Sequence, residues 1–328
     1  MRLSASRRTG NRSGPHDAAD CSEVVSIDCS SDAHSFAATS YLTAAGPSGA
    51  VRSPGSGRRR SRGGRMDLQL TGKTAFISGS TQGIGYATAK AVAAEGADVI
   101  LNGRDSRQLT EAVGRLRREV PGASVSGLPA DFAVTEDVDR LCDRIPSVDI
   151  LINNVGLFEL KPFERISDDD WRLYFEVNVL SGVRLARRLM PTMLDRGWGR
   201  IVFVSSESGV DIPADMIHYG TSKTAMLSVG NGLAKLTKGT AVTVNSVLGG
   251  PTYSDGVAAT VKTLAAAQSL PEEQMKAAII GANQTTLLGR FIEPGEIANA
   301  IAFIASPLAS AINGSAVRVD GGVLTTVL

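Results

Sequence analysis

Cysteine and histidine are scarce in this sequence, and no long apolar run is present. The 328 residues include three cysteines and three histidines. Cys21 and Cys29 lie near the N-terminus, so only Cys142 falls in the remaining part of the chain. This argues against a disulfide framework and a cysteine-based zinc site, and we expect no metal cofactor. No apolar run reaches the roughly 18 residues of a membrane span, so we expect no membrane partner.

An excess of charge of one sign is also missing, because the net charge at pH 7 is +1. Residues 1–65 contain ten arginines, no lysine and five acidic residues, a balance of +5. Subtracting this from the total leaves −4 for residues 66–328, so we expect no nucleic-acid partner. A content of 43% hydrophobic and 20% charged residues is typical of a soluble globular protein. We expect a cytoplasmic one.

The first 65 residues are rich in serine, glycine and arginine and have little apolar periodicity. Such a segment buries too little apolar surface to offset its ordering entropy, so we expect a disordered extension. A transit peptide would be Ser- and Arg-rich but poor in acidic residues, which does not fit here. The basic run Arg58–Arg65 is short for a nucleic-acid tail. We favour an over-extended start with Met66 as the true initiator, because ordered sequence begins directly after it.

Beyond Met66 the sequence alternates between short apolar runs and helical segments. The predicted strands are residues 74–78, 98–101, 125–130, 149–152, 201–204, 241–247 and 316–319, and the main predicted helices are residues 83–95, 106–119, 135–144, 168–195 and 214–238. Such alternation predicts a parallel sheet covered on both faces. The predicted fold class is therefore α/β, a Rossmann-type doubly wound sheet of about seven strands, with residues 66–328 as one domain. Its ligand crevice should lie at the carboxyl ends of the strands.

The first turn from strand to helix is rich in glycine. Its residues are Gly79, Ser80, Thr81, Gln82, Gly83, Ile84 and Gly85. Glycines let the backbone approach a phosphate, and the helix N-terminus offers unpaired N–H groups. Because the turn follows the first strand and opens the first helix, it favours dinucleotide binding over a mere packing turn.

The end of the second predicted strand indicates which dinucleotide is bound. An acidic residue there would accept hydrogen bonds from the adenosine ribose. This sequence has Gly103 and Arg104 instead, and a guanidinium suits the 2′-phosphate of NADP(H). The alternative is a solvated arginine that opens a helix. We therefore expect NADP(H) rather than NAD(H).

Tyr219 and Lys223 stand four residues apart in a predicted helix, so both side chains project from one face. A positive charge near a phenol favours the phenolate, which makes the two residues a proton-transfer pair. The alternative is a half-buried tyrosine beside a lysine stem. Ser206, directly after the fifth predicted strand, could reach the same place. His218 has no assigned role, and its position is more typical of a structural residue.

Asn178 interrupts the apolar residues of the long helix predicted at residues 168–195. A mid-helix asparagine competes with the backbone for hydrogen bonds and can bend the helix. The alternative is a tertiary hydrogen bond that holds the helix to the sheet.

Together these residues resemble a classical short-chain dehydrogenase/reductase. The resemblance is based on Gly79-x-x-x-Gly83-Ile84-Gly85, Asn153-Asn154-x-Gly156, Asn178, Ser206, Tyr219-x-x-x-Lys223 and the closing Arg318-Val319-Asp320-Gly321-Gly322. It implies that Tyr219 is the general acid or base and that Lys223 binds the nicotinamide ribose and lowers the pKa of the tyrosine. It also implies that Ser206 orients the carbonyl and that Asn178 holds a water in the proton relay.

The resemblance adds further cofactor contacts, and the sequence departs from the family at three places. The added contacts are Asp131, Phe132, Asn154, Gly156, Thr252 and Ser254. Ser78 replaces the usual threonine and Val155 the usual alanine, while Gly249–Gly250 replaces Pro-Gly and should loosen the following loop. None of these changes removes a catalytic group.

The segment 253–290 is a substrate lid by the same resemblance. Its apolar residues Val257, Val261, Leu264, Met275 and Ile279 suggest an apolar inner face, although ordinary helix packing explains them equally well. We also expect a homodimer or homotetramer built through the two long helices. Two apolar stripes indicate this interface: Val179, Gly182, Val183, Ala186 and Met190, then Ala225, Met226, Val229, Leu233 and Leu236.

The sequence thus predicts an oxidoreductase that transfers a hydride between NADP(H) and a small-molecule carbonyl or alcohol. A 3-oxoacyl compound or another ketone would fit as substrate. The alternative is a catalytically silent nucleotide-binding regulator or scaffold on the same fold. Loss of Tyr219 or Lys223 would favour that alternative, and both are present.

Overall fold

The computed structural model describes residues 66–283 and 285–327. The predicted domain, residues 66–328, is therefore described except for its residues 284 and 328. The predicted N-terminal extension, residues 1–65, lies outside the described residues.

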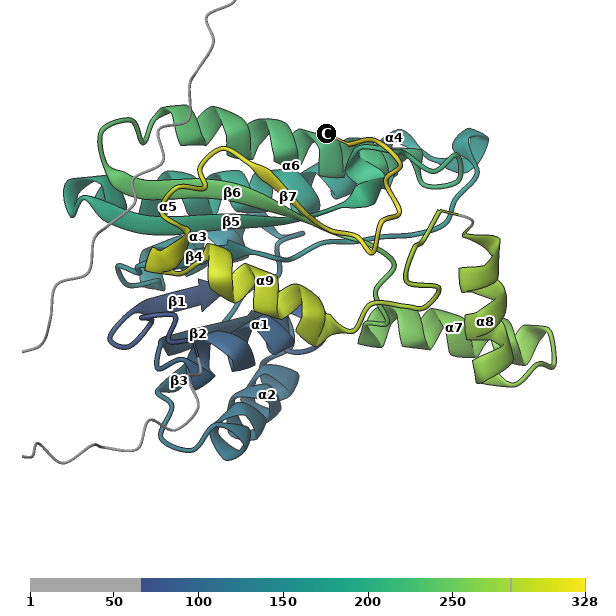
Figure 1. Ribbon diagram of the computed structural model, residues 1–328, viewed down its shortest axis with the longest axis horizontal. Coiled ribbons are helices and arrows are strands. Elements are labelled where there is room, and N and C mark those ends of the chain that lie inside the picture. Colours follow the sequence, from purple (N-terminus) through teal and green to yellow (C-terminus); the bar gives the residue numbers. More distant parts are fainter. Residues whose placement is uncertain (1–65, 284, 328) are drawn as a thin grey trace, which may run out of the picture. The chain divides into compact units, whose positions relative to one another are not determined.

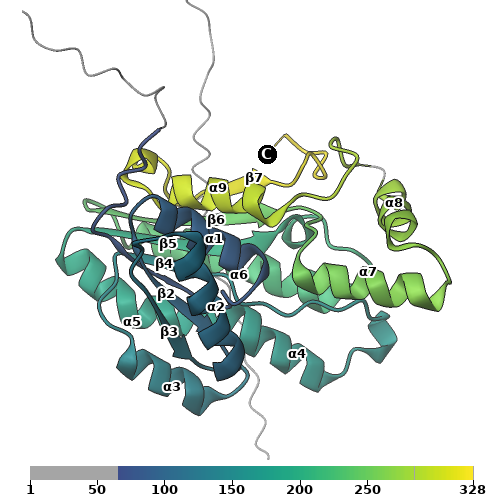
Figure 2. The same ribbon diagram turned by 90° about the horizontal axis from the view of Figure 1, so that it is seen from below.

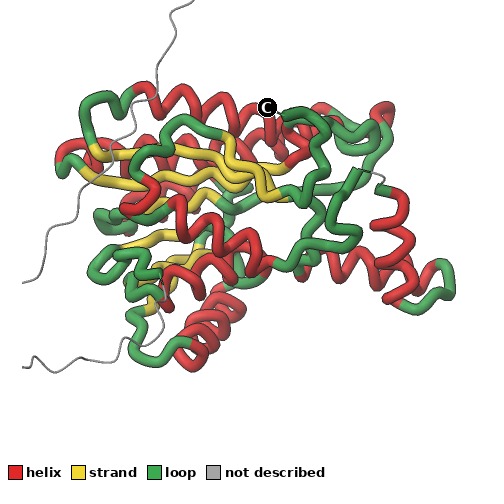
Figure 3. The backbone as a smooth tube through the Cα atoms, in the orientation of Figure 1, coloured by secondary structure: helices red, strands yellow, loops and turns green. Residues whose placement is uncertain are grey.

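A parallel sheet of seven strands lies at the centre of the fold, as predicted (Figures 1 and 3). Its strands are β1 (Thr74–Ile77), β2 (Asp98–Gly103), β3 (Val125–Pro129), β4 (Ile150–Asn153), β5 (Trp198–Ser206), β6 (Ala241–Gly249) and β7 (Ala316–Val319). They are arranged in the order β3-β2-β1-β4-β5-β6-β7. The inner strands are apolar on both faces because helices cover both faces.

Two helical layers enclose the sheet (Figure 2). On one face α1 (Gly83–Ala94), α2 (Ser106–Glu119) and α9 (Pro294–Ile304) form a core with the strands. On the other face α3 (Thr135–Arg144), α5 (Ser181–Asp195) and α6 (Ile217–Lys235) form a second core. The strand order reverses beside β1, which has β2 on one side and β4 on the other. In open α/β sheets such a reversal creates the ligand crevice at the carboxyl ends of the strands.

The long helix predicted at residues 168–195 is interrupted. It consists of α4 (Asp168–Tyr174), a π-helical turn η2 (Phe175–Leu180) and α5. Asn178 lies inside the π-helical turn, so the predicted disturbance of the helix is located there. Helix α6 is three residues shorter at each end than the predicted 214–238. Strand β5 is longer than predicted because it pairs with β6 over its whole length, from Trp198 to Ser206.

Two further helices, α7 (Asp255–Ala267) and α8 (Glu272–Ala282), lie beyond the carboxyl ends of the strands (Figure 1). The apolar residues predicted to form the inner face of a lid pack against one another here. Val261 and Met275 are buried at the centre of this cluster, with Val257, Leu264 and Ile279 around them. The cluster gives the α7–α8 segment a small core of its own.

A buried arginine ties the amino end of β5 to α9. Arg200 is only 1% exposed, and burial lowers the pKa of its guanidinium to about 10. The guanidinium donates to the backbone carbonyls of Ser306 (3.1 Å), Gly199 (2.9 Å) and Ala241 (2.7 Å). These three bonds connect the end of α9 with the edges of β5 and β6.

We expect Arg200→Met to lower the free energy of unfolding by about 2–4 kcal/mol, because two buried carbonyls and one partly buried carbonyl lose their charged donor. Denaturant unfolding would measure this loss. Arg187→Met is the matched control, since Arg187 is exposed on α5 and its loss should cost under about 0.5 kcal/mol. An equal effect of both substitutions would contradict the role of Arg200.

Candidate active site

The glycine-rich loop between β1 and α1 is held by a buried asparagine from β2. The side-chain oxygen of Asn102 accepts a hydrogen bond from the Gly79 N–H at 3.0 Å. Its amide nitrogen donates to the Leu128 carbonyl of β3 at 3.0 Å. The backbone N–H of Asn102 donates to the Ser80 hydroxyl at 2.9 Å, so Ser80 faces inward. Asn102 was not among the residues predicted from the sequence, although a polar residue at the end of an apolar strand is a visible signal.

A second asparagine joins the same loop to the end of β4. The side-chain amide of Asn154 donates to the carbonyls of Ser78 (3.1 Å) and Gly79 (2.8 Å). A Cβ atom at Gly85 would lie 2.4 Å from the Gly79 oxygen and 2.5 Å from the Asn154 nitrogen. Only glycine therefore fits at this position, and α1 packs directly against the loop.

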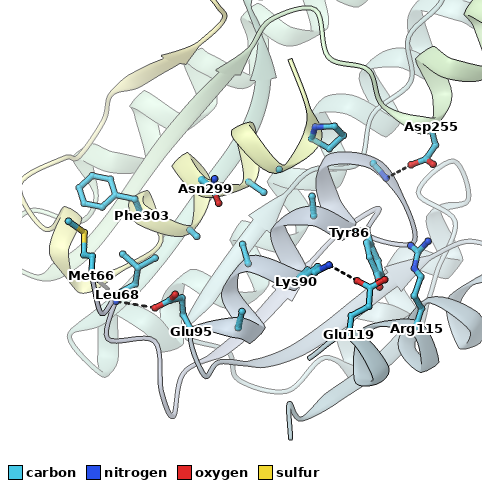
Figure 4. A pocket seen from close by; sticks show the side chains of 18 residues that line it. Met66, Leu68, Tyr86, Lys90, Glu95, Arg115, Glu119, Asp255, Asn299 and Phe303 are labelled. Carbon is cyan, nitrogen blue, oxygen red and sulfur yellow. Dashed lines mark hydrogen bonds and ion pairs between the residues drawn. The ribbon is translucent and has the colours of Figure 1, made fainter. Parts of the chain in front are cut away.

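An acidic residue of α7 also reaches the glycine-rich loop. The Asp255 carboxylate accepts a hydrogen bond of 2.7 Å from the Gly83 N–H (Figure 4). This N–H belongs to the first residue of α1, where helices leave unpaired donors that favour an anion. Asp255 therefore occupies one donor of a ready-made anion site, and the sequence analysis did not include it.

Tyr219 and Lys223 lie on one face of α6, as predicted from their spacing. The Lys223 ammonium is buried, donates to the Val204 carbonyl at 3.0 Å and lies 5.6 Å from the centre of the Tyr219 ring. Burial lowers the pKa of Lys223 to about 8. Burial also raises the pKa of the Tyr219 phenol, against a hydrogen bond with Ser206 that lowers it. At neutral pH Tyr219 is therefore a protonated phenol that can donate.

The π-helical turn places the Asn178 side chain behind this pair. Its oxygen accepts from the Leu157 N–H at 2.7 Å, and its amide nitrogen donates to the Leu157 carbonyl (3.1 Å) and the Ser222 hydroxyl (2.9 Å). A Cβ atom at Gly156 would lie 3.2 Å from the Lys223 nitrogen. Asn178 thus joins the loop after β4 to α6 through tertiary hydrogen bonds, and π-helical turns are frequent at functional sites. Its predicted role in a water relay stays a prediction.

Ser206 ends β5 beside an acidic residue. The Ser206 hydroxyl lies 2.5 Å from the carboxyl Oε2 of Glu207 and accepts a hydrogen bond of 3.1 Å from the Ser208 N–H. Burial raises the pKa of Glu207 despite hydrogen bonds from Ser206 and Ser208 that lower it. The sequence analysis missed Glu207, although an acidic residue directly after a buried strand was visible.

A cavity of about 590 Å³ brings most of the predicted residues together. The predicted residues that line it are Gly79, Thr81, Gln82, Gly83, Ile84, Arg104, Asp131, Phe132, Asn154, Gly156, Tyr219, Lys223 and Ser254. Ser80, Gly85, Asn178, Ser206 and Thr252 do not line it. Ser80 and Gly85 lie on the inner side of the glycine-rich loop and hold it in place. The Thr252 hydroxyl donates to the Gly250 carbonyl at 2.8 Å.

A larger cavity, of about 970 Å³, lies between α1, α2 and α9 (Figure 4). It contains neither Tyr219 nor Lys223, and the Lys90–Glu119 ion pair of 2.9 Å lies at its wall. His218 is likewise separate from the lining of the smaller cavity. Its buried ring packs against Tyr174, with 4.1 Å between the ring centres, and neither ring nitrogen has a hydrogen-bond partner among the described residues. This placement agrees with a structural residue.

A family model described as "short chain dehydrogenase" matches residues 73–285, well over half of the chain. The chain belongs to the short-chain dehydrogenase family. Two curated relatives from Bacillus subtilis (strain 168) are the uncharacterised oxidoreductases YvrD, 44% identical over 267 residues, and YvaG, 41% identical over 263 residues. In each case the match covers 80% of this chain and 100% of the relative.

A solved structure of similar fold is the L-sorbose reductase of Gluconobacter frateurii, crystallised with NADPH and L-sorbose. It is 32% identical, with a TM-score of 0.76, and the match covers 80% of this chain and 100% of that one. Within residues 66–283 and 285–327 of this short-chain dehydrogenase, no cluster of three or more His, Cys, Asp or Glu could hold a metal ion. In the same residues no helix has the length and apolar character needed to cross a membrane.

The packing of α1 against the loop predicts that Gly85→Ala destabilises this dehydrogenase by about 1–3 kcal/mol, because the added methyl group overlaps backbone. Gly114→Ala is the control, since only an arginine side chain lies near its Cβ position on α2. There alanine should stabilise the helix by about 0.5–1 kcal/mol. Denaturant unfolding of both variants measures the difference, and a fully stable Gly85→Ala protein would disprove the close packing.

Proposed function

We propose that this short-chain dehydrogenase interconverts a ketone and an alcohol with NADP(H), and that Tyr219 donates or accepts the proton of the reacting oxygen. The observation that supports this most directly is that Tyr219, Lys223 and the glycine-rich loop line one cavity. Their spacing alone would not distinguish Tyr219 and Lys223 from an ordinary pair of residues on a helix surface. Here Lys223 is buried and Tyr219 half-buried beside a dinucleotide-type loop, which makes a proton-transfer role chemically reasonable.

The residues around the cavity fit NADP(H). The N-terminus of α1 and the glycines before it suit a pyrophosphate. Arg104 is exposed at the mouth of the cavity, and among the described residues its guanidinium has no hydrogen bond or ion pair. It is therefore available for a 2′-phosphate. The cofactor would supply the hydride when bound, and the L-sorbose reductase of similar fold was crystallised with NADPH.

The proton chemistry belongs to the chain's own residues. In the direction of reduction the Tyr219 phenol donates its proton to the substrate oxygen, as a general acid. The Lys223 ammonium stabilises the phenolate that is left. Ser206 holds the substrate oxygen beside Tyr219, and Asn178 keeps the loop after β4 in place. The competing function, a silent nucleotide-binding regulator, gives no reason for this arrangement of Tyr219, Lys223 and Ser206.

The substrate is proposed as a small ketone or its alcohol, and residues 253–290 as the lid over it. The similar structure is a reductase of L-sorbose, a polyhydroxy ketone. A panel of L-sorbose, a ketogluconate, a 3-oxoacyl ester and the activated diketone phenanthrenequinone, assayed with NADPH and with NADH, tests the proposal. NADPH oxidation with at least one of them is the expected result, and none with any of them would favour the regulator.

We also propose a homodimer or homotetramer, on narrower grounds than the sequence suggested. Four of the five residues of the first predicted stripe are buried within their own chain, and so is Met226 of the second; the four are Val179, Gly182, Ala186 and Met190. These residues pack against the sheet and do not form surplus surface. Leu180, in the π-helical turn, remains 39% exposed and Leu236, after α6, is 65% exposed. These two exposed leucines support an interface that involves the ends of the two long helices.

We expect Tyr219→Phe to lower turnover by roughly 10²–10⁴-fold, the usual contribution of a general acid, while the Kd for NADPH changes only a few-fold. Steady-state kinetics and fluorescence titration measure the two quantities. Tyr86→Phe removes a phenol from the other cavity and should retain activity. Near-normal turnover in the Tyr219 variant would disprove the proposed proton donor.

Arg104→Ala should weaken NADPH binding by roughly ten- to a hundred-fold, because a hydrogen bond to a charged group contributes about 1.5–3 kcal/mol. NADH binding should hardly change, since NADH has no 2′-phosphate. Arg118→Ala, at the far end of α2, is the control for lost positive charge. If both cofactors lose affinity equally, Arg104 does not read the phosphate.

A further inference from the structure

The Ser206 hydroxyl has several polar neighbours but only one proton to donate. It accepts from the Ser208 N–H at 3.1 Å and lies 2.5 Å from Glu207 Oε2. Ser206 also acts on the Tyr219 phenol, whose pKa it lowers. A serine hydroxyl has one proton and two acceptor positions. The Ser208 N–H fills one acceptor position of the Ser206 hydroxyl. The hydroxyl proton and the remaining lone pair are left for two neighbours, the Glu207 carboxyl and the Tyr219 phenol: one of them receives the proton and the other faces the lone pair.

The charge of Glu207 decides how they are shared. An ionised carboxylate can only accept, so the Ser206 proton must point to Glu207 and a lone pair faces Tyr219. A protonated carboxyl can donate into Ser206 instead. The Ser206 proton is then free to point toward Tyr219, where the reacting oxygen of a substrate would lie.

We propose that Glu207 is a positioning residue that sets the direction of the Ser206 hydroxyl, and thereby favours carbonyl reduction when protonated and alcohol oxidation when ionised. A carbonyl oxygen has only lone pairs, so it requires a donor from Ser206. An alcohol brings its own proton, which a Ser206 lone pair can accept. This inference rests on the proposed oxidoreductase function.

The surroundings of Glu207 favour the protonated form of its carboxyl. Within residues 66–283 and 285–327 no cation lies within ion-pair distance of it, and burial raises its pKa. Hydrogen bonds from the Ser206 hydroxyl and from the backbone N–H groups of Glu207 and Ser208 lower this pKa, but burial outweighs them. The Ser208 hydroxyl adds a long contact of 3.4 Å to Oε1. The titratable groups that face it, Tyr219 and Lys223, both come from α6, and a negative charge on Glu207 raises the pKa of each.

The first test is the pH profile of kcat/KM for ketone reduction by wild-type and Glu207→Gln enzyme. A glutamine amide donates to Ser206 at every pH, like the protonated acid. Wild-type reduction should fall about tenfold per pH unit above the pKa of Glu207, whereas the variant should remain active to higher pH. The variant should also lose alcohol oxidation relative to reduction.

A purely electrostatic role gives the opposite sign. Removing the negative charge lowers the pKa of Tyr219 and Lys223, so the alkaline loss of reduction would move to lower pH. A profile that is unchanged or moves downward would overturn the proposal. Glu164→Gln is the matched control, because Glu164 is exposed and its profile should follow the wild type.

A second test needs no turnover. Infrared difference spectra of the cofactor-free protein, recorded over pH, should show a protonated carboxyl band that disappears in Glu207→Gln and persists in Glu164→Gln. Ser206→Ala removes a donor to the carboxylate, so the titration of this band should move upward by roughly one pH unit. An unmoved titration would show that Ser206 and Glu207 are not coupled.

The two tests separate the inference from the proposed function. Absence of NADPH-linked turnover on the whole panel refutes the function, and the infrared titration still reports on the Ser206–Glu207 bond. An active wild type whose Glu207 is ionised throughout its active range would refute the inference alone.

Discussion

The close contact between the glycine-rich loop and the end of β4 is the constraint on which the site depends. Asn154 bonds two carbonyls of that loop, and Gly85 leaves no space between the loop and α1. With the loop fixed against the sheet, the N-terminus of α1 points into the same cavity as Tyr219 and Lys223. The anion-binding and proton-transfer parts of the site are therefore positioned by backbone packing before any ligand is present.

Desolvation gives this cavity its electrostatic character. Burial moves the pKa of Tyr219 and Glu207 upward and that of Lys223 downward. All three shifts favour the neutral form, as expected where charges lose water without an ion-pair partner. In such a site Tyr219 and Glu207 keep their protons more readily than they would in water, and Lys223 loses its proton more readily. Such poised groups suit a reaction in which a proton enters or leaves an oxygen atom.

The features that the sequence predicted correctly are those that depend on local residue patterns. The seven strands followed from apolar runs, and the shared face of Tyr219 and Lys223 followed from helical spacing. The π-helical turn was not predictable in form, because hydrogen bonds from Asn178 to Leu157 and Ser222 stabilise it across the fold. The raised pKa of Tyr219 was not predictable either, because desolvation raises it and desolvation depends on tertiary packing that no spacing reveals.

The bond between Asp255 and the Gly83 N–H joins residues 172 positions apart in the sequence, and it makes the α7–α8 segment a competitor for its own anion site. If a phosphate of the proposed cofactor accepts a hydrogen bond from the Gly83 N–H, the Asp255 carboxylate must first move away from it. The measured affinity is then the intrinsic affinity multiplied by the fraction of molecules in which α7 has moved away. Substitutions in the α7–α8 segment that change how often Asp255 withdraws would therefore change cofactor affinity, even where the substituted residue touches no nucleotide.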